Sequence, residues 1–243
     1  MLKTFHSFYL KQRFFPNWIS VLINPFFITR RAMLKKICLF TPELTGSILD
    51  FGCGAKPYKE LFTQSTRYVG VDLENEAHDH SNEEIDVYYD GITLPFEDGS
   101  FQNVFCSEVL EHVPNIHHSL HEMNRVLEMN GKILITVPFV FPEHEMPFDY
   151  RRLTLIGITQ ALKESGFEVI KTEKFGSFFQ VIHQLIIMYI HDLLYTKNKY
   201  LNLLINALFI CPITIFAIIV NPFIIKNRSL YFGNIVLAKK ISL

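Results

Sequence analysis

The stretch Leu49-Asp-Phe-Gly-Cys-Gly-Ala55 decides the fold, because it joins a short apolar run to a turn with two glycines. The run at 47–51 predicts a buried strand. Gly52 and Gly54 let the backbone turn tightly and approach a ligand closely. Asp72 ends the next predicted strand about 20 residues on, where an acid of this fold class accepts hydrogen bonds from ribose hydroxyls. Pro57 occupies the region of the third glycine of a dinucleotide site, so the pattern favours a nucleoside site over a pyrophosphate site.

Outward from this turn, apolar runs alternate with segments of helical spacing, which is typical of a parallel, doubly wound α/β sheet. In the helix predicted over 115–129, the apolar residues share one side, and Asn130-Gly131 is expected to end it. The predicted strands are 47–51, 67–72, 85–89, 101–106, 132–137, 167–174 and 229–240, and a second helix is predicted over 154–165.

Five segments in order resemble class I SAM-dependent methyltransferases of the type 11-like group, which includes ubiquinone and menaquinone biosynthesis enzymes. The resemblance covers roughly residues 45–175. It implies a Rossmann-like α/β fold, with a seven-stranded mostly parallel sheet and helices on both faces, and S-adenosyl-L-methionine as cofactor. The segments are 49–55, 69–72, 89–96, 101–113 and 124–134.

The resemblance also implies a set of cofactor-binding residues. Asp50 and the glycine backbone would hold the methionine end, Asp72 the ribose, and Asp90 the adenine amino group. The alternative for Asp90 and Glu108 is a turn or helix cap. The full expected set is Asp50, Gly52, Cys53, Gly54, Asp72, Leu73, Asp90, Gly91, Ser107 and Glu108, with Leu94, Phe96 and Val109 as apolar walls.

Catalytic candidates lie in the loop 138–154, which follows a strand and is expected over the ligand-binding edge of the sheet. A general base is needed only when the acceptor must lose a proton. His144 is the first candidate, with Asp149 orienting it or binding the acceptor, and His112 is the second. Arg151 or Arg152 would bind an acidic acceptor group. The alternative is a structural loop in which an arginine pairs with a glutamate and the histidine caps a turn.

The loop also resembles that of bacterial methyltransferases associated with surface-polysaccharide genes. A small-molecule or lipid-linked glycan acceptor is therefore expected. The alternatives are a quinone or other small lipid, and a non-catalytic membrane-associated scaffold. No metal is expected, because the histidines near 78–80 and 117–121 lack an H-E-x-x-H motif or a cysteine partner.

The flanks differ from this core. Residues 1–42 hold seven lysines and arginines among aromatic residues and no acid, and 200–225 hold no charge. Such segments suit a membrane surface. We expect a helical arm at 1–42, the core at 43–175, and at 176–243 a hydrophobic helical insertion followed by the last strand. Helix 178–195 is expected to pair with the apolar segment as a hairpin in the membrane interface, with a kink or break at Pro212. The alternatives are a solvated basic arm, and burial of the insertion against the core or in a homodimer.

The overall composition of the chain bears on its partners and its compartment. The chain has 243 residues and a formal net charge of −1, so no nucleic-acid partner is expected. The four cysteines form no C-x-x-C pair, and the N-terminus lacks the apolar run of a secretory signal. A cytoplasmic protein, peripheral on the inner face of a membrane, fits these features.

Overall fold

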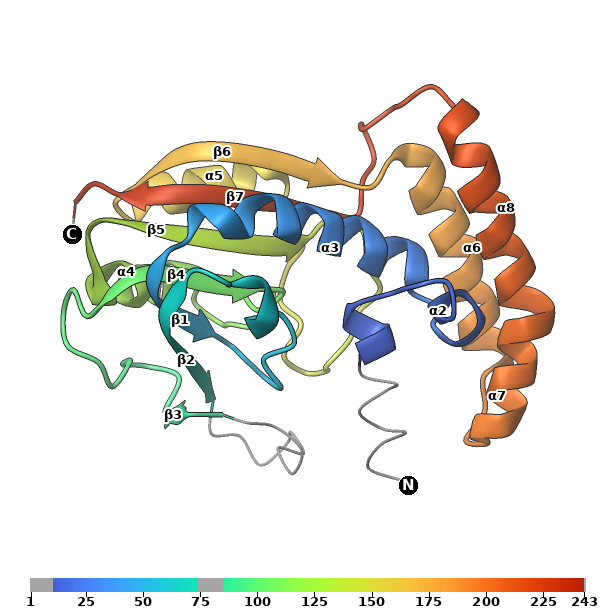
Figure 1. The fold of residues 1–243 in the computed structure, drawn as a ribbon, viewed down its shortest axis with the longest axis horizontal. Coiled ribbons are helices and arrows are strands. Elements are labelled where there is room, and N and C mark those ends of the chain that lie inside the picture. The colour runs from blue at the N-terminus through green and yellow to red at the C-terminus, as the bar shows by residue number, and fades with distance from the viewer. Residues whose placement is uncertain (1–10, 74–84, 243) are drawn as a thin grey trace. The chain divides into compact units, whose positions relative to one another are not determined.

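The computed structural model describes residues 11–73 and 85–242, and the chain divides into two compact units (Figure 1). The sheet unit comprises Ile37–Lys174 and Gly233–Leu243. The helical unit comprises Met1–Lys36 and Phe175–Phe232. The last strand thus returns to the sheet unit after the hydrophobic segment.

The sheet unit is built on seven strands in the order β3-β2-β1-β4-β5-β7-β6. Strands β1 to β5 pair in parallel, and β7 is antiparallel to β5. The predicted seven-stranded, mostly parallel sheet is confirmed. The strands are β1 (Gly46–Phe51), β2 (Ser65–Leu73), β3 (Val87–Tyr89), β4 (Phe101–Ser107), β5 (Leu127–Pro138), β6 (Phe167–Phe175) and β7 (Gly233–Lys240).

Strand β1 lies at the point where the strand order reverses, because it pairs with β2 on one side and β4 on the other. Its side chains Ile48, Leu49 and Phe51 are buried at 1% exposure or less. In an open α/β sheet, ligands bind beyond the carboxyl ends of the strands at such a switch point. The glycine turn after Phe51 is therefore held at the expected binding edge.

Helices cover the sheet on both faces. Helices α4 (Ile116–Val126) and α5 (Leu155–Glu164) pack together on one face, and both lie behind the sheet in Figure 1. On the other face, Phe40, at the end of α3 (Phe27–Phe40), is fully buried and lies 4.8 Å from the Lys171 ammonium. Asn115 begins α4 by accepting a hydrogen bond from the backbone N–H of His118, an N-cap that satisfies a free donor.

The predicted end of the 115–129 helix is wrong. Helix α4 ends at Val126, and β5 begins at Leu127, which pairs with Phe101 of β4. The buried Lys240 ammonium of β7 donates to the carbonyl oxygens of Asn124 and Leu127 at 2.8 Å. A distant side chain thus donates to these carbonyl oxygens at the helix end. Asn130, which was expected to end the helix, lies within β5, where it has a left-handed φ of 67°. The third and last predicted strands are also too long at their starts, since β3 begins at Val87 and β7 at Gly233.

The helical unit contains a hairpin of long helices. Helix α6 (Phe178–Leu194) contacts the run formed by α7 (Lys199–Ile205), a π-helix (Asn206–Ile210) and α8 (Cys211–Val220). The short helix α2 (Ser20–Ile23) also contacts this run, and the Gln184 side chain of α6 donates to the carbonyl oxygen of Pro25 at 2.9 Å. The expected hairpin is present. The helix does not break at Pro212, which lies near the start of α8, directly after the π-helical segment.

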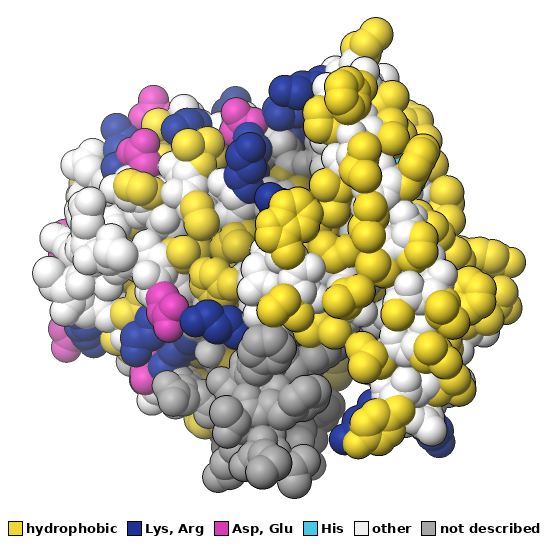
Figure 2. Space-filling view, turned by 45° about the vertical axis from the view of Figure 1, so that its right-hand side comes forward, with side chains coloured by type: hydrophobic (Ala, Val, Ile, Leu, Met, Phe, Trp, Pro, Cys, Tyr) yellow, Lys and Arg dark blue, Asp and Glu magenta, His cyan; other side chains and the backbone are white. Residues whose placement is uncertain are grey.

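The run Lys199–Phe223 is the one helix among the described residues that is long and apolar enough to cross a membrane, with a mean hydropathy of 2.7. Only 33% of its most apolar window is buried, so most of it faces outward. Figure 2 shows hydrophobic side chains gathered on this helical unit. The large apolar side chains exposed on the run include Leu203, Leu204, Leu208, Phe209, Ile215, Phe216, Ile219 and Phe223.

Candidate functional site

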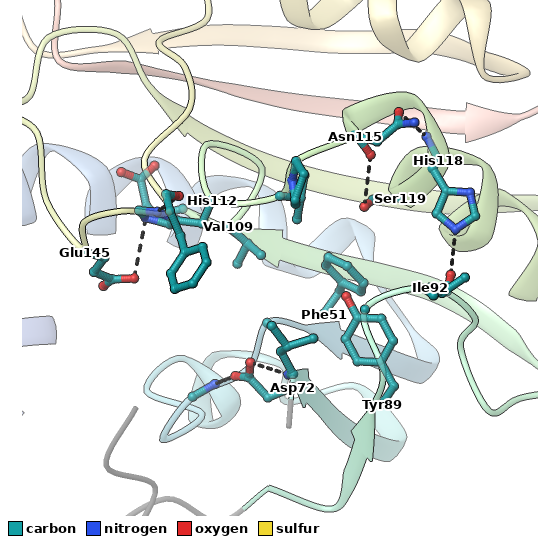
Figure 3. Close-up of a pocket in the computed structure, with 18 residues that line it drawn as sticks. Phe51, Asp72, Tyr89, Ile92, Val109, His112, Asn115, His118, Ser119 and Glu145 are labelled. Carbon is teal, nitrogen blue, oxygen red and sulfur yellow. Dashed lines mark hydrogen bonds and ion pairs between the residues drawn. The ribbon is translucent and has the colours of Figure 1, made fainter. Parts of the chain in front are cut away.

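A cavity of about 570 Å³ lies beyond the carboxyl ends of β1, β2 and β4 in the sheet unit. This size is typical of a small-molecule site. Figure 3 shows its lining, with Asp72, Phe51 and Tyr89 on one side and Val109, His112 and Glu145 on the other. Of the residues predicted to bind the cofactor, Gly52, Gly54, Asp72, Leu73, Gly91 and Glu108 line it.

The glycine turn forms the part of the lining that follows β1. Gly52 and Gly54 have φ values of 68° and 45°, a left-handed backbone that other residues rarely adopt. A Cβ on Gly52 would lie 2.4 Å from a methyl carbon of Val109. There is thus no room for a side chain at Gly52, and at Gly52 and Gly54 the backbone itself lines the cavity.

Asp72 ends β2 and faces this turn. One carboxylate oxygen accepts from the Gly54 N–H and the other from the Leu73 N–H, both at 2.7 Å. Each carboxylate oxygen has more than one acceptor position, so the group can accept from several donors at once. The position matches the expected ribose contact, although the contact itself stays a prediction.

The edge beside β3 is aromatic. The rings of Phe51 and Tyr89 lie 5.8 Å apart, and both line the cavity.

Asp90 does not line the cavity. Its carboxylate is fully exposed and accepts from the N–H groups of Ile92 and Thr93 at 2.8 and 3.0 Å, and these hydrogen bonds lower its pKa. Asp90 therefore acts as a turn cap in this structure, which was the alternative, and its adenine contact stays a prediction.

Three other expected cofactor residues lie behind the lining. Asp50 is buried and accepts a 2.6 Å hydrogen bond from the Tyr68 hydroxyl, and burial raises its pKa to about 7. Cys53 is buried, which raises the pKa of its thiol, and Ser107 shares a 2.9 Å hydrogen bond with Thr136. These side chains support the strand ends rather than face the cavity. The proposed apolar walls Leu94 and Phe96 likewise pack in or against the core, whereas Val109 lines the cavity.

The segment after β4 supplies the opposite side. Glu108 lines the cavity with a φ of 55°. Glu145 has a φ of 54° and also lines it, although it comes from the loop after β5. Non-glycine residues held in this left-handed region cluster at functional sites. The two strained carboxylate residues thus mark this side of the cavity.

The three predicted catalytic residues are brought together. The Nε2 atoms of His112 and His144 lie 3.2 Å apart, and the Asp149 carboxylate accepts from the His144 backbone N–H at 2.9 Å. Of the three, only His112 lines the cavity. Burial and the neighbouring His112 lower the pKa of His144, which favours its neutral form.

The loop arginines do not line the cavity. Arg152 donates to both carboxylate oxygens of Asp149, at 2.5 and 2.6 Å, and holds the pKa of that carboxyl well below its usual range. Arg151 donates to the backbone carbonyls of Leu110, Val113 and Pro114. Arg151 thus fixes the loop against the segment after β4, whereas Arg152 holds the loop together from within. The structural alternative expected an arginine to pair with a glutamate, and the observed partner of Arg152 is Asp149.

Sequence reasoning missed several lining residues. His118 Nε2 donates a 2.7 Å hydrogen bond to the Ile92 carbonyl oxygen, and Asn115, Ser119 and Phe148 complete this part of the cavity. No motif marks them, because helix and loop residues reach the cavity only through the tertiary fold. His117 is half exposed and lies 3.8 Å from Glu164, and residues 78–80 lie outside the described part of the chain.

Residues 49–135, from β1 into β5, match the family model for a methyltransferase domain. An uncharacterized protein of Methanocaldococcus jannaschii is 32% identical over 128 residues, which are 51% of this chain and 55% of that protein. The 27-O-demethylrifamycin SV methyltransferase of Amycolatopsis mediterranei is 29% identical over 100 residues, or 36% of this chain and 37% of that one. The matches thus span about half of one curated relative and about a third of the other.

Solved structures share the fold. A SAM-dependent methyltransferase of Mesorhizobium loti superposes with a TM-score of 0.53 at 15% identity, over 86% of this chain and 98% of that one. The methyltransferase domain and the class I fold expected from the motif series are therefore confirmed. The association with surface-polysaccharide genes stays a prediction.

Proposed function

We propose that this chain, which carries a class I SAM-dependent methyltransferase domain, transfers a methyl group to a lipid-linked or membrane-proximal acceptor. Its cofactor is S-adenosylmethionine. The observation that carries the enzymatic part is the single cavity in which the glycine turn and Asp72 face His112 and Glu145. The membrane part rests on the surface of the helical unit.

The cofactor half of the cavity fits an adenosyl ligand. The backbone of the Gly52–Gly54 turn is held open for the amino-acid end, Asp72 offers acceptors to the ribose hydroxyls, and Phe51 and Tyr89 offer apolar faces to the base. The bound sulfonium supplies an electrophilic methyl group, and the negative charge of Asp72 favours that cation. The protein's main task is then to align the acceptor with the methyl carbon and sulfur.

The other half holds the acceptor. When a hydroxyl is methylated, a C–O bond forms, the C–S bond breaks with its electron pair going to sulfur, and the hydroxyl proton must leave. We assign the promotion of that loss to His112 and Glu145, two of the ionisable side chains that line this side, and Phe148 adds an apolar contact. His144 lies against His112, and Asp149 holds His144 in place, so both act as positioning residues.

Charge is divided unevenly between the two units. Residues 1–36 and 175–232 contain eleven lysines and arginines and one acidic residue, Asp192, although the whole chain is nearly neutral. The same unit exposes the apolar side chains of Lys199–Phe223. A basic, apolar surface suits an anionic membrane, since electrostatic attraction and apolar burial add. This supports peripheral attachment and hence an acceptor within reach of the bilayer.

The test uses the full chain and a labelled methyl donor. S-adenosylmethionine with a labelled methyl group is incubated with the protein and with bacterial membrane lipids or a water-soluble extract, and the label is followed by chromatography. We expect the label in the lipid fraction. Transfer only into water-soluble compounds would overturn the membrane acceptor, and no binding of the cofactor by calorimetry would overturn the enzyme itself.

A further inference from the structure

The residues beside the acceptor half of the cavity form a cluster of nitrogen and oxygen ligands. One ligand atom each of Glu111, His112 and His144 lies within 4.8 Å of the others. The Glu145 carboxylate is 3.7 Å from His112 Nε2, a contact drawn in Figure 3, and the Glu111 carboxylate is 3.8 Å from the same atom. Two turns that follow neighbouring strands, β4 and β5, supply these side chains.

The hydrogen bonds of the two imidazoles identify the ring nitrogen that carries the hydrogen. His112 Nδ1 lies 3.0 Å from the Phe148 carbonyl oxygen, and His144 Nδ1 lies 3.2 Å from the Pro142 carbonyl oxygen and 3.3 Å from the Asp149 carboxylate. These oxygens only accept, so each Nδ1 carries a hydrogen, and the neutral tautomer with that hydrogen has a bare Nε2. Arg152 is 3.5 Å from His144 Nδ1, but it donates over shorter distances to Asp149 and Pro142. Two bare Nε2 atoms 3.2 Å apart repel each other unless a cation or a shared proton lies between them.

The buried Glu111 carboxyl is a second, independent indication of a cation or a proton at this place. Its side chain is 2% exposed, and neither carboxylate oxygen has a hydrogen-bond partner. Buried polar groups are nearly always satisfied, and a buried carboxylate needs a cation or a proton.

We propose that Glu111, His112 and His144 bind a divalent transition-metal ion, with Zn²⁺ the best match, and that Glu145 lies near the fourth position, toward the cavity. Zinc takes imidazole nitrogen and carboxylate oxygen at about 2.0–2.2 Å, which places neighbouring tetrahedral ligands roughly 3.3 Å apart. The observed Nε2 separation is 3.2 Å. Mg²⁺ and Ca²⁺ prefer all-oxygen sites, so two imidazoles select against them.

The groups around the ligands have the usual supporting arrangement of a metal site. Metal-bound histidines donate their other N–H to a backbone carbonyl or a carboxylate. His112 does so to Phe148, and His144 to Pro142 and Asp149, which Arg152 holds in place. This second part of the inference rests on the proposed function: an ion here would bind the acceptor oxygen and lower the pKa of its hydroxyl, so that the proton leaves more easily. The expectation of no metal rested on the histidines near 78–80 and 117–121 and did not consider this cluster. His112 and His144 come from separate loops, and no motif joins them.

Binding of Zn²⁺ to the chelator-treated full chain tests the site, with no cofactor present. We expect one ion per chain by calorimetry, a Zn²⁺-dependent rise in melting temperature, and a visible absorption band with Co²⁺ as the probe. His144→Asn and Glu111→Gln should weaken binding at least about 100-fold, and Asp149→Asn about 10- to 100-fold, which is typical when a supporting hydrogen bond is lost. His117→Asn, on the exposed part of α4, is the matched control and should bind normally.

Misfolding of the variants is separated from loss of ligands by measuring S-adenosylmethionine binding to each metal-free variant, because neither His144 nor Glu111 lines the cavity. Absence of stoichiometric binding in the wild-type protein would overturn the site and leave the shared-proton arrangement of the histidines. Binding that survives the double variant E111Q/H144N would overturn it as well. Neither result affects cofactor binding, so failure of the metal site and failure of the methyltransferase proposal are distinguishable.

Discussion

The Asp72 carboxylate accepts a 2.7 Å hydrogen bond from the backbone N–H of Gly54, across 18 residues of sequence. The acid at the end of β2 thus fixes the glycine turn at the end of β1, in addition to facing the cavity. Because β1 and β2 are parallel neighbours, their carboxyl ends meet at one edge of the sheet. One side chain therefore contributes both to the shape of the site and to its charge.

Asp72→Asn should weaken binding of S-adenosylmethionine by roughly 10- to 100-fold. The amide loses the charge and part of the acceptor capacity, and hydrogen bonds to a charged group are worth about 1.5–3 kcal/mol. Isothermal calorimetry measures the effect. Glu168→Gln, in an exposed ion pair with Lys239, is the control and should bind as the wild type does. Equal affinity of all three proteins would discredit the assigned cofactor site.

Gly52→Ala should nearly abolish cofactor binding, because its Cβ would lie 2.4 Å from Val109 and its φ is 68°. Gly99→Ala is the matched control: its φ of 62° is similarly left-handed, but the nearest atom to its Cβ would be 3.8 Å away. Both variants should lose about 1 kcal/mol of stability from backbone strain. Only Gly52→Ala should lose affinity, and Val109→Ala in the same chain should restore part of it.

Asp50→Asn should stabilise the protein at high pH. The pKa of Asp50 is about 7 in the fold against an ordinary 3.8, with burial the main cause. For an acid with a raised pKa, the fold is most favoured when the group is protonated, and stability is lost as the pH rises from about 4 to 7. The difference amounts to at most about 4 kcal/mol.

Urea unfolding at about pH 4 and about pH 8 measures this dependence. The variant should be more stable than the wild type at the higher pH and nearly equal to it at the lower. The amide still accepts from the Tyr68 hydroxyl, so the packing is preserved. A constant difference between the two proteins across this range would contradict the raised pKa.

Lys240→Met should destabilise the sheet unit by about 1–3 kcal/mol. The ammonium donates to two carbonyl oxygens at the junction of α4 and β5. In the variant Leu127 O would lose this donor, and Asn124 O would keep only the hydrogen bond from the Leu127 N–H. Thermal or urea unfolding gives the loss. Lys239→Met removes an exposed ion pair on the same strand and should change the stability by less than about 1 kcal/mol. Similar losses in both variants would refute this role of Lys240.

The double variant F209S/F216S should reduce flotation with anionic vesicles. Both rings are at least 50% exposed on the apolar helical run, and each buried phenylalanine contributes roughly 1.5–3 kcal/mol. Ile170→Ser removes a similarly exposed side chain from the sheet unit and should float as the wild type does. If the wild-type protein itself stays with the soluble fraction, the apolar helices cover a subunit contact instead.

The ordered motifs predicted which positions along the chain face the ligand, because in a parallel sheet these positions follow the carboxyl ends of successive strands. The turn after β1 and the acid after β2 were found in this way. Asp50 and Asp90 show the limit of such reasoning. A motif gives the position of a residue on a strand or turn, but its side chain turns toward Tyr68 in one case and toward backbone N–H groups in the other.

Local sequence by itself determined the α/β class, the glycine turn and the hydrophobic hairpin, since periodicity and turn chemistry act over a few neighbouring residues. Only the tertiary structure decided where α4 ends, because the lysine that satisfies its carbonyls comes from the last strand. It alone also brought His144 to His112 and enclosed Glu111 beside them. Burial and lone-pair direction depend on chain segments that are distant in sequence, and they decide which ionisable groups share an ion or a proton.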